Sequence, residues 1–439
     1  MKKSPIDHII KPVSKFIHLE YTSGIVLFIG VLLAIIWVNS PFKDAYHHLW
    51  EIEFGIGFDD NVLRHPLHLW INDGLMAIFF FVIGLELKRE FIAGELSSVK
   101  RAALPMAAAL GGMLVPAAIY SLVNYGKEGA HGWGIPMATD IAFALALLSM
   151  AGKQIPTSVK VFLSALAVAD DLGAVLVIAM FYSAQLQFTP LMIGGIFLLV
   201  LVIGNAIGVR HTAFYLIIGF GVWIGFLLSG VHATIAGVLV AFTIPARRKI
   251  DEKRYSLRLR ELSEEFEQEI PNCSILTTPK QHEIIEHIKG LSIAAQTPLQ
   301  KIESALHPWV AFVIMPVFAL ANSGIIIESD FLKNLANPVS IGVTVGLVIG
   351  KFTGVLLFTW LLVKSKFAEL PERATWRHIV GISALAGIGF TMSLFVSSLA
   401  FSDSKMVEQA KYGILIASLI AGTAGTLLLR HAGKQLSAR

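Results

Sequence analysis

Two adjacent aspartates, Asp170 and Asp171, lie inside an apolar stretch that reads VFLSALAVADDLGA. About 20 apolar residues cross a bilayer as a helix, and an ionised carboxylate near the middle costs several kcal/mol unless it has a partner. Neighbouring residues point about 100° apart around a helix, so one carboxylate can face water and the other protein. Two carboxylates this close bind protons in a coupled way, and Na⁺ or Li⁺ would compete for the same oxygens. The pattern predicts proton-coupled cation exchange; a purely structural pair satisfied by buried donors is the alternative.

A third acid, Asp140, lies in the segment GIPMATDIAFALALL, directly after Thr139. Pro136 removes a backbone hydrogen-bond donor there, and Gly134 weakens the helix further. A membrane span broken at this point leaves backbone groups unpaired, and only protein or water can satisfy them. The two half-helix N-termini would carry partial positive charge, which Asp140 would offset. Thr139 could supply a hydroxyl or support the unwound segment.

A second interrupted span is predicted near the C-terminal end of the chain, where LAGIGFTMS breaks an apolar helix with glycines. Lys351 lies in the middle of another apolar segment. A buried lysine there could offset two half-helix C-termini, pair with Asp170, or do both, and it could also carry a proton or be purely structural. The simplest arrangement groups Lys351, Asp140 and the aspartate pair at one polar centre, because charges inside a membrane normally pair with one another.

The overall composition is that of a membrane protein. Of the 439 residues, 55% are hydrophobic and 15% are charged, and the mean hydropathy is +0.69. These values and the long uncharged runs indicate an all-α polytopic membrane protein. Outer-membrane barrels are excluded because their strands alternate in shorter segments. The single cysteine, Cys273, excludes a disulfide framework and a cysteine metal site, and we expect no cofactor, no catalytic residue and no nucleic-acid partner.

We predict twelve transmembrane helices in one transporter domain that covers residues 1–439. Spans four and eleven are the broken ones, and spans three to five and ten to twelve would form inverted-topology repeats, a pattern typical of transporter cores. The expected ranges are 22–39, 66–87, 102–125, 132–150, 157–181, 188–209, 212–228, 231–246, 304–325, 338–363, 375–400 and 406–430.

The basic residues are distributed unequally between the two sides of this topology. With a cytoplasmic N-terminus, the short cytoplasmic ends and loops hold 18 Lys and Arg residues and the opposite side holds 6. The long segment 247–302 adds 10 on the cytoplasmic side, and Lys351 is the last of the 35. This excess follows the positive-inside rule, so we predict that both termini are cytoplasmic and that the lipid bilayer surrounds the spans.

The external loop 40–65 contains the sequence WEIEFGIGF. Glu51, Glu53 and Gly55 alternate there with apolar residues, as in a strand with a glycine turn. A short β-hairpin on the outer surface is one interpretation, and its exposed edge could pair with a second subunit. An interfacial loop with aromatic anchors is the other.

The segment 247–302 is the only large polar stretch and is predicted to be a cytoplasmic insert. Apolar residues recur at helical spacing in 254–270, and 282–293 could form another amphipathic helix. The insert is either a flexible or surface-lying segment or a specific regulatory domain.

Charged residues also gather near the cytoplasmic end of the second span, in GLELKRE, which contains Glu86, Arg89 and Glu90. Such charges usually form a solvated helix end, but a titrating cluster would result if Glu303 of span nine faced them. His232, near the outer end of span eight, is a candidate pH sensor, although a hydrogen-bonded residue at a helix end is the commoner explanation.

Several long motifs of this chain resemble the bacterial NhaA-type sodium/proton antiporters, over essentially the whole sequence except 247–302. These motifs are ATDIAFALALLS, LAVADDLGAV, WIND…GLELKRE, LHPWVAF, the dipeptide at Gly350–Lys351, and GIGFTMS. The resemblance implies electrogenic, pH-regulated extrusion of cytoplasmic Na⁺ or Li⁺ in exchange for protons across the bacterial inner membrane, with roles in pH homeostasis and salt tolerance. NhaA-type antiporters are themselves a known example of inverted repeats, so this architecture is also an implication of the resemblance.

The resemblance also assigns roles to the residues at the predicted polar centre. Asp170 and Asp171 match the cation- and proton-binding acids of the family. Thr139 and Asp140 match residues of its unwound fourth span, and Lys351 matches its buried lysine, which can pair with the first acid of the doublet.

The pH response of the family is associated with five further positions. They correspond here to Glu86, Arg89, Glu90, Glu303 and Gly389. The external hairpin resembles the dimer contact of the family, which implies a homodimer.

Two features depart from the family pattern. The insert 247–302 is longer than usual, and in this the chain is similar to the Helicobacter members. Gln300 and Ser304 stand where ionisable residues are expected beside Glu303, so the pH-response profile does not follow from the resemblance.

Two other classes of protein place acids inside membranes. A cation channel would need neither coupled protonation nor inverted broken helices. An intramembrane aspartyl protease would need two acids on separate helices that flank a peptide, which an adjacent doublet beside a buried lysine fits poorly.

Overall fold

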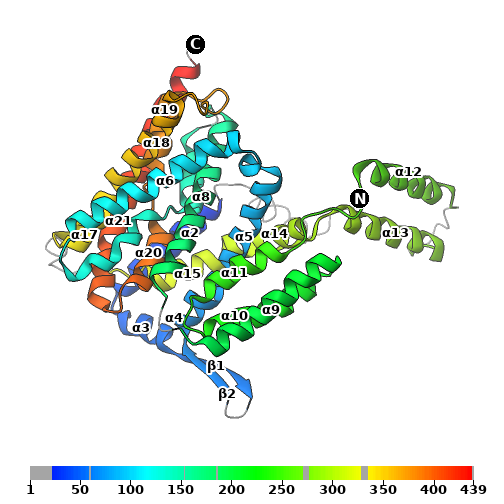
Figure 1. The fold of residues 1–439 in the computed structure, drawn as a ribbon, viewed down its shortest axis with the longest axis horizontal. Coiled ribbons are helices and arrows are strands. Elements are labelled where there is room, and N and C mark those ends of the chain that lie inside the picture. The colour runs from blue at the N-terminus through cyan, green and yellow to red at the C-terminus, as the bar shows by residue number, and fades with distance from the viewer. Residues whose placement is uncertain are drawn as a thin grey trace.

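In a computed structural model the chain forms a bundle of long helices with one small two-stranded sheet (Figure 1). The structure describes residues 22–58, 61–152, 154–183, 186–269, 276–327 and 335–437. The predicted cytoplasmic N-terminal tail and Cys273 lie outside these ranges.

The first half of the chain contains the β-hairpin and four of the seven long apolar helices. Its elements are α2 (Thr22–Val38), α3 (Lys43–Glu51), β1 (Glu53–Phe58), β2 (Asn61–Pro66), α4 (Leu67–Leu69), η1 (Trp70–Leu75), α5 (Met76–Ala93), η2 (Glu95–Ser97), α6 (Val99–Val123), η3 (Glu128–Met137), α7 (Ile141–Ala151), α8 (Thr157–Phe181), α9 (Phe188–Ile207), α10 (Thr212–Leu227) and α11 (Ala233–Thr243).

The second half begins with the insert and ends with the longest helix. Its elements are α12 (Glu252–Gln268), α13 (Pro279–Ala295), α14 (Pro298–Trp309), η4 (Val310–Ile314), α15 (Met315–Asn322), α17 (Pro338–Val345), η5 (Gly346–Lys351), α18 (Phe352–Lys364), α19 (Trp376–Leu385), α20 (Phe390–Ala400) and α21 (Ser404–Ser437). The segments η1, η4 and η5 are π-helical turns inside longer helices, whereas η2 and η3 are 3₁₀-helical.

Within the described residues, seven helices are long and apolar enough to cross a membrane, and up to ten segments qualify if each of three bent helix pairs is one span. Two shorter apolar helices, α10 and α11, pack beside them. The chain is therefore a polytopic helical membrane protein. The predicted number of twelve spans stays a prediction.

In the described part of the chain, the helices surround two large apolar cores and one small cluster around Leu87, Leu96 and Val168. The larger core joins α2, α6, α8, α15 and the C-terminal helices α17 to α21. The smaller core lies between α5, α9, α10, α11 and α14. The broken helices, described below, belong to the larger core.

A row of glycines brings α6 within backbone contact of the helix that carries Lys351. Glycines 346, 350 and 354 lie on one helix face, because they are four residues apart. A Cβ atom at Gly354 would lie 2.1 Å from the Gly111 carbonyl oxygen, and one at Gly350 would lie 2.6 Å from the Pro116 Cα. Small residues allow such close packing in a membrane, where no hydrophobic effect draws helices together.

The predicted hairpin in the external loop is confirmed, with two corrections to its details. Strands β1 and β2 pair antiparallel, with Gly55 opposite Arg64 and Phe58 opposite Asn61. Gly55 therefore lies inside a strand and not at a turn. Glu51 ends helix α3, which the sequence pattern did not predict, because the alternation was extended two residues too far toward the N-terminus.

The insert forms a helical hairpin that projects from the body of the protein (Figure 1). Helices α12 and α13 pack on each other through Leu262 and Ile284, which are both buried. Backbone hydrogen bonds at the base, from Lys249 to Ala294 and from Leu299 to Pro245, hold the two ends of the insert together. The insert is thus attached directly to α14, the first helix of the following span.

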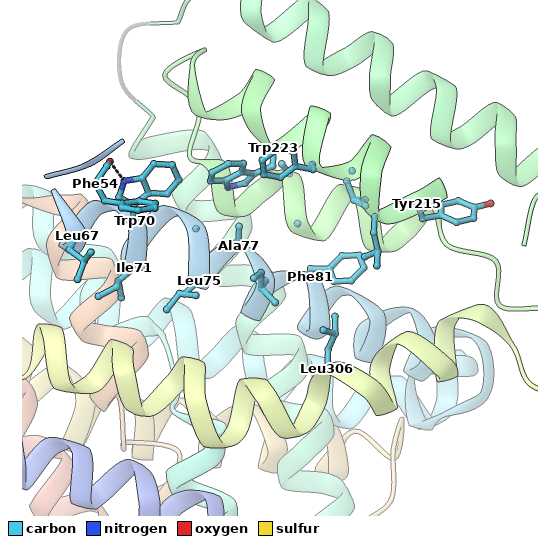
Figure 2. Close-up of a pocket in the computed structure, with 18 residues that line it drawn as sticks. Phe54, Leu67, Trp70, Ile71, Leu75, Ala77, Phe81, Tyr215, Trp223 and Leu306 are labelled. Atoms are coloured by element: carbon cyan, nitrogen blue, oxygen red, sulfur yellow. Dashed lines mark hydrogen bonds between the residues drawn. The ribbon is translucent and has the colours of Figure 1, made fainter. Parts of the chain in front are cut away.

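An apolar groove of about 560 Å³ lies where the β-hairpin meets the helices, between α5 and α10 (Figure 2). Trp70 and Trp223 lie at one end of the groove, and the Trp70 indole donates to the Phe54 carbonyl of β1 (2.8 Å). Tryptophans with one apolar and one hydrogen-bonding side are typical of the membrane–water interface.

The glycine contact between α6 and α18 gives the first testable prediction. Gly354→Ala should lower the free energy of unfolding by about 1–3 kcal/mol, the usual cost of overpacking, because its Cβ meets a backbone oxygen that cannot move aside. The matched control is Gly195→Ala in α9, where a Cβ would meet nothing within 4 Å. Apparent melting temperatures of the purified proteins in detergent measure both effects. Equal melting temperatures would contradict the close packing.

Candidate ion-binding site

The two predicted broken helices cross each other in the larger core. Helices η3 and α7 are bent by 45° at their break, and α19 and α20 are bent by 44°. The Asp140 amide donates to the Ile388 carbonyl (2.7 Å), and the Ser393 hydroxyl donates to the Ile135 carbonyl (2.8 Å). Each unwound segment thus supplies hydrogen-bond partners for the other, as buried backbone groups in a membrane require.

Asp140 accepts hydrogen bonds from the N-terminal ends of two half-helices. Its carboxylate accepts from the Phe143 amide of α7 (3.0 Å) and from the Thr391 amide of α20 (3.1 Å). The Thr391 hydroxyl donates to the same carboxylate oxygen. A negative charge at this point offsets both half-helix dipoles, which is the arrangement expected from the sequence for one acid beside a broken span.

Lys351 contacts the first aspartate of the doublet. Its ammonium group donates to Asp170 Oδ2 and to the Thr139 hydroxyl (2.6 Å), and all three side chains are fully buried. The Thr139 hydroxyl oxygen also lies 2.9 Å from the Ala386 carbonyl at the C-terminal end of α19. Lys351 therefore pairs with Asp170 and is linked through Thr139 to a half-helix C-terminus.

The aspartate doublet keeps unused oxygen ligands. Asp170 Oδ1 and Asp171 Oδ2 are buried and have no hydrogen-bond partner within the described part of the chain. Asp170 is 0% and Asp171 is 1% exposed, so neither carboxylate reaches the surface in this conformation, although the sequence allowed one of them to face water. Buried polar atoms are normally satisfied, and a carboxylate oxygen without a hydrogen-bond partner can accept a proton or a hard cation.

The predicted four-residue centre is divided into two linked parts. Lys351, Asp170 and Thr139 form one hydrogen-bonded group, and Asp140 with Thr391 forms the other. The Thr139–Asp140 peptide bond joins them. Within the described residues, no group of three or more His, Cys, Asp and Glu side chains is arranged to hold a metal ion.

In the predicted cytoplasmic cluster, three side chains are in contact: Arg89, Glu90 and Glu303. The Arg89 guanidinium pairs with the buried carboxylate of Glu303 and lies 3.4 Å from Glu90. Glu90 also accepts from the Glu95 amide (3.0 Å). Glu86 lies one helical turn before Glu90 on the same helix, without a direct hydrogen bond to these residues among the contacts of the described chain.

His232 and Gly389 lie apart from this cluster. His232 directly precedes α11, and its ring lies 2.6 Å from the Tyr182 carbonyl oxygen. This contact is as expected for a hydrogen-bonded residue at a helix end. Gly389 precedes α20, and a Cβ atom there would lie 2.2 Å from the Ser393 hydroxyl oxygen. Gly389 is thus required by packing at the crossing, which leaves its role in pH response a prediction.

The broken-helix pattern does not by itself predict which hydroxyl groups hold the crossing together. Thr391, which donates to Asp140, and Ser393, which donates to the Ile135 carbonyl, both belong to the motif GIGFTMS. The hydroxyl residues directly after the glycines were a usable signal, because a helix that restarts inside a membrane needs polar side chains near its first turn.

Two broken helices that cross beside buried charges define a class of protein, the secondary transporters, of which NhaA-type antiporters are a known example. The family model described as Na⁺/H⁺ antiporter 1 matches residues 14–429. The chain belongs to this family.

Close relatives match the chain along nearly its full length. The Na(+)/H(+) antiporter NhaA of Oleidesulfovibrio alaskensis is 50% identical over 427 residues, which cover 97% of this chain and 95% of that protein. The Na(+)/H(+) antiporter NhaA of Acidithiobacillus ferrooxidans is 48% identical and covers 96% of this chain and 97% of that protein. The Na(+)/H(+) antiporter NhaA 1 of Psychromonas ingrahamii is also 48% identical, over 94% of this chain and 95% of that protein.

Thr391→Val should destabilise the protein by about 1.5–3 kcal/mol, because it removes a hydroxyl that donates to a buried carboxylate and keeps the side-chain shape. The matched control is Thr359→Val, since Thr359 is also fully buried but its hydroxyl donates only to the Val355 carbonyl of its own helix. Thermal unfolding of the two variants in detergent gives the comparison. If Thr359→Val lowered the stability more than Thr391→Val, the stabilising role proposed for the Thr391–Asp140 hydrogen bond would be contradicted.

Proposed function

We propose that this protein exchanges sodium or lithium ions for protons across the bacterial inner membrane and extrudes cytoplasmic Na⁺. The observation that carries the proposal is the buried aspartate doublet, with its free oxygens beside the Lys351–Asp170 pair. The family and the names of the relatives support the identity of the two ions.

The chemistry of the pair explains why the two ions would exclude each other. A cation on Asp170 and Asp171 needs both carboxylates ionised, so proton binding to either one expels it. The same cation competes with the Lys351 ammonium group for Asp170. Raising the pH favours the cation-bound form and lowering it favours release, so a pH difference across the membrane drives exchange. Electrogenic exchange requires more protons than cations per cycle, and the doublet together with Lys351 offers enough sites.

Two further features of the proposal concern membrane topology. Seven long helices, the two bent pairs η3–α7 and α19–α20, helix α2 and the two shorter apolar helices would together make twelve crossings, which supports the predicted number. The two breaks, with bends of 45° and 44°, occupy the same place in spans three to five and ten to twelve, which supports inverted repeats. Cytoplasmic termini follow from the positive-inside count.

Dimerisation through the external hairpin belongs to the same proposal. A sheet of only two strands is marginal alone and leaves both of its edges unpaired. The hairpin projects from the helical body (Figure 1), so an edge is accessible to a second copy.

Removing one carboxylate tests the exchange directly. Everted vesicles that hold a pH gradient should lose it on addition of Na⁺ or Li⁺, seen as recovery of a quenched pH dye. Asp170→Asn and Asp171→Asn should each abolish this recovery, because one carboxylate is lost from the competing site. The matched control, Asp44→Asn at the exposed start of α3, should respond like the wild type. Absence of any cation response from pH 6.5 to about 9 in the wild type would refute the antiporter proposal.

Neutralising the buried acid of the cytoplasmic cluster tests pH regulation. Glu303→Gln removes the partner of Arg89, so the pH of half-maximal exchange should move while the maximal rate is retained. Glu286→Gln is the control, because its pair with Lys289 is exposed on the insert. Vesicle assays over a pH series measure both profiles. If the exchange activity of Glu303→Gln depended on pH in the same way as that of the wild type, this cluster would have no role in pH sensing.

A further inference from the structure

A second groove runs along α21, with α2 and α7 forming its other wall. Its cavity volume is about 550 Å³, and its lining extends along α21 from Leu415 to Arg430. Ile388 of the second break and Phe390, the first residue of α20, also line it. We call this cavity the α21 groove.

The shape of the α21 groove fits a lipid chain. Fifteen residue steps along a helix correspond to about 22 Å, and one leaflet of the hydrocarbon core is about 15 Å thick. The walls carry aliphatic and aromatic side chains such as Ile25, Phe28 and Leu419. The groove can therefore hold an extended acyl chain from the membrane edge to its middle.

One end of the α21 groove is cationic. Arg430 lies near the end of the candidate span Ser404–Gly433, and its guanidinium is 3.5 Å from the Met150 carbonyl, at the limit of a hydrogen bond. Arg430 has no carboxylate partner within the described residues, and no lining residue of the groove is acidic. Thr426, one turn before it, lines the groove with a hydroxyl that is buried and lacks a hydrogen-bond partner in the same part of the chain.

The groove beside the β-hairpin provides a comparison. It has nearly the same volume, about 560 Å³, but no lysine or arginine lines it (Figure 2). An apolar groove alone attracts any acyl chain, whereas a free guanidinium at the depth of the headgroups selects for negative charge.

We propose that the α21 groove binds one anionic phospholipid, with an acyl chain along α21 and the headgroup phosphate on Arg430. Its chain would contact the crossing of the broken helices directly. The Ile388 carbonyl accepts from the Asp140 amide, and the Phe390 amide donates to the Ser418 hydroxyl of α21 (3.3 Å). The bound lipid thus supports the second break from its lipid-facing side.

Native mass spectrometry of the purified protein tests the proposal. The probes are phosphatidylglycerol and phosphatidylcholine with identical acyl chains. The wild type should retain phosphatidylglycerol preferentially, and Arg430→Gln should weaken its binding about tenfold, the factor expected for one charge-assisted hydrogen bond. Arg210→Gln is the control, because Arg210 is a membrane-edge arginine outside the groove that donates to the Arg247 carbonyl (2.8 Å). It should leave retention unchanged.

A second variant tests the position of the acyl chain. Leu419→Trp fills the α21 groove and should reduce phosphatidylglycerol retention, whereas Leu216→Trp in the groove beside the hairpin should not. Equal retention of the two phospholipids by the wild type would overturn the proposal. Unchanged phosphatidylglycerol binding in both Arg430→Gln and Leu419→Trp would also overturn it. A wild type that retains no phospholipid, because its own residues fill the groove, would do the same.

Discussion

The central constraint on this structure is that backbone groups freed by a broken helix inside a membrane must be satisfied by protein. Both breaks meet this constraint through each other. The Asp140 amide is paired with the Ile388 carbonyl, and the Asp140 carboxylate holds the first turns of α7 and α20. Each break would be less stable alone, because the Asp140–Ile388 and Ser393–Ile135 hydrogen bonds join one break to the other. The crossing is therefore one cooperative unit, and the ion-binding groups are attached to it through Thr139.

The second constraint on the site is the burial of the Lys351–Asp170 pair, because both charges are removed from water. Breaking such a pair by losing one partner typically costs about 3–5 kcal/mol, since the other charge stays buried. In the exchange proposed above, a mobile cation would replace Lys351 on Asp170, because Asp170 and Asp171 each keep one oxygen without a hydrogen-bond partner in the described part of the chain. A site in which a fixed cation, a mobile cation and protons share a limited number of oxygens can hold only some of them at once. That limitation is the physical basis of exchange.

The sequence was sufficient to predict the charged residues and both breaks, which depend on local residue types. The aspartate doublet, Pro136 beside Asp140 and the glycines before Phe390 predicted the ionisable groups and both breaks. The missing partner was Thr391, which lies 251 residues from Asp140 in sequence and meets it only in the folded chain. Helix α3 was missed for a similar reason. Its buried residues, Tyr46 and Trp50, are specified by packing against the larger core, whereas its mixed polar sequence gives no membrane signal.

The close packing of two helix backbones determines where the Lys351 ammonium group lies. The π-helical turn η5 ends at Lys351, and such turns shift the face that a side chain takes relative to a regular helix. Gly350 and Gly354 on the adjoining face press that helix against Pro116 and Gly111 of α6. Because lipid supplies no hydrophobic force between helices, this contact is maintained only while both surfaces stay small. A wider spacing between α6 and α18 would alter the position of the ammonium group relative to Asp170, so the proposed ion site depends on the glycines as much as on the charges.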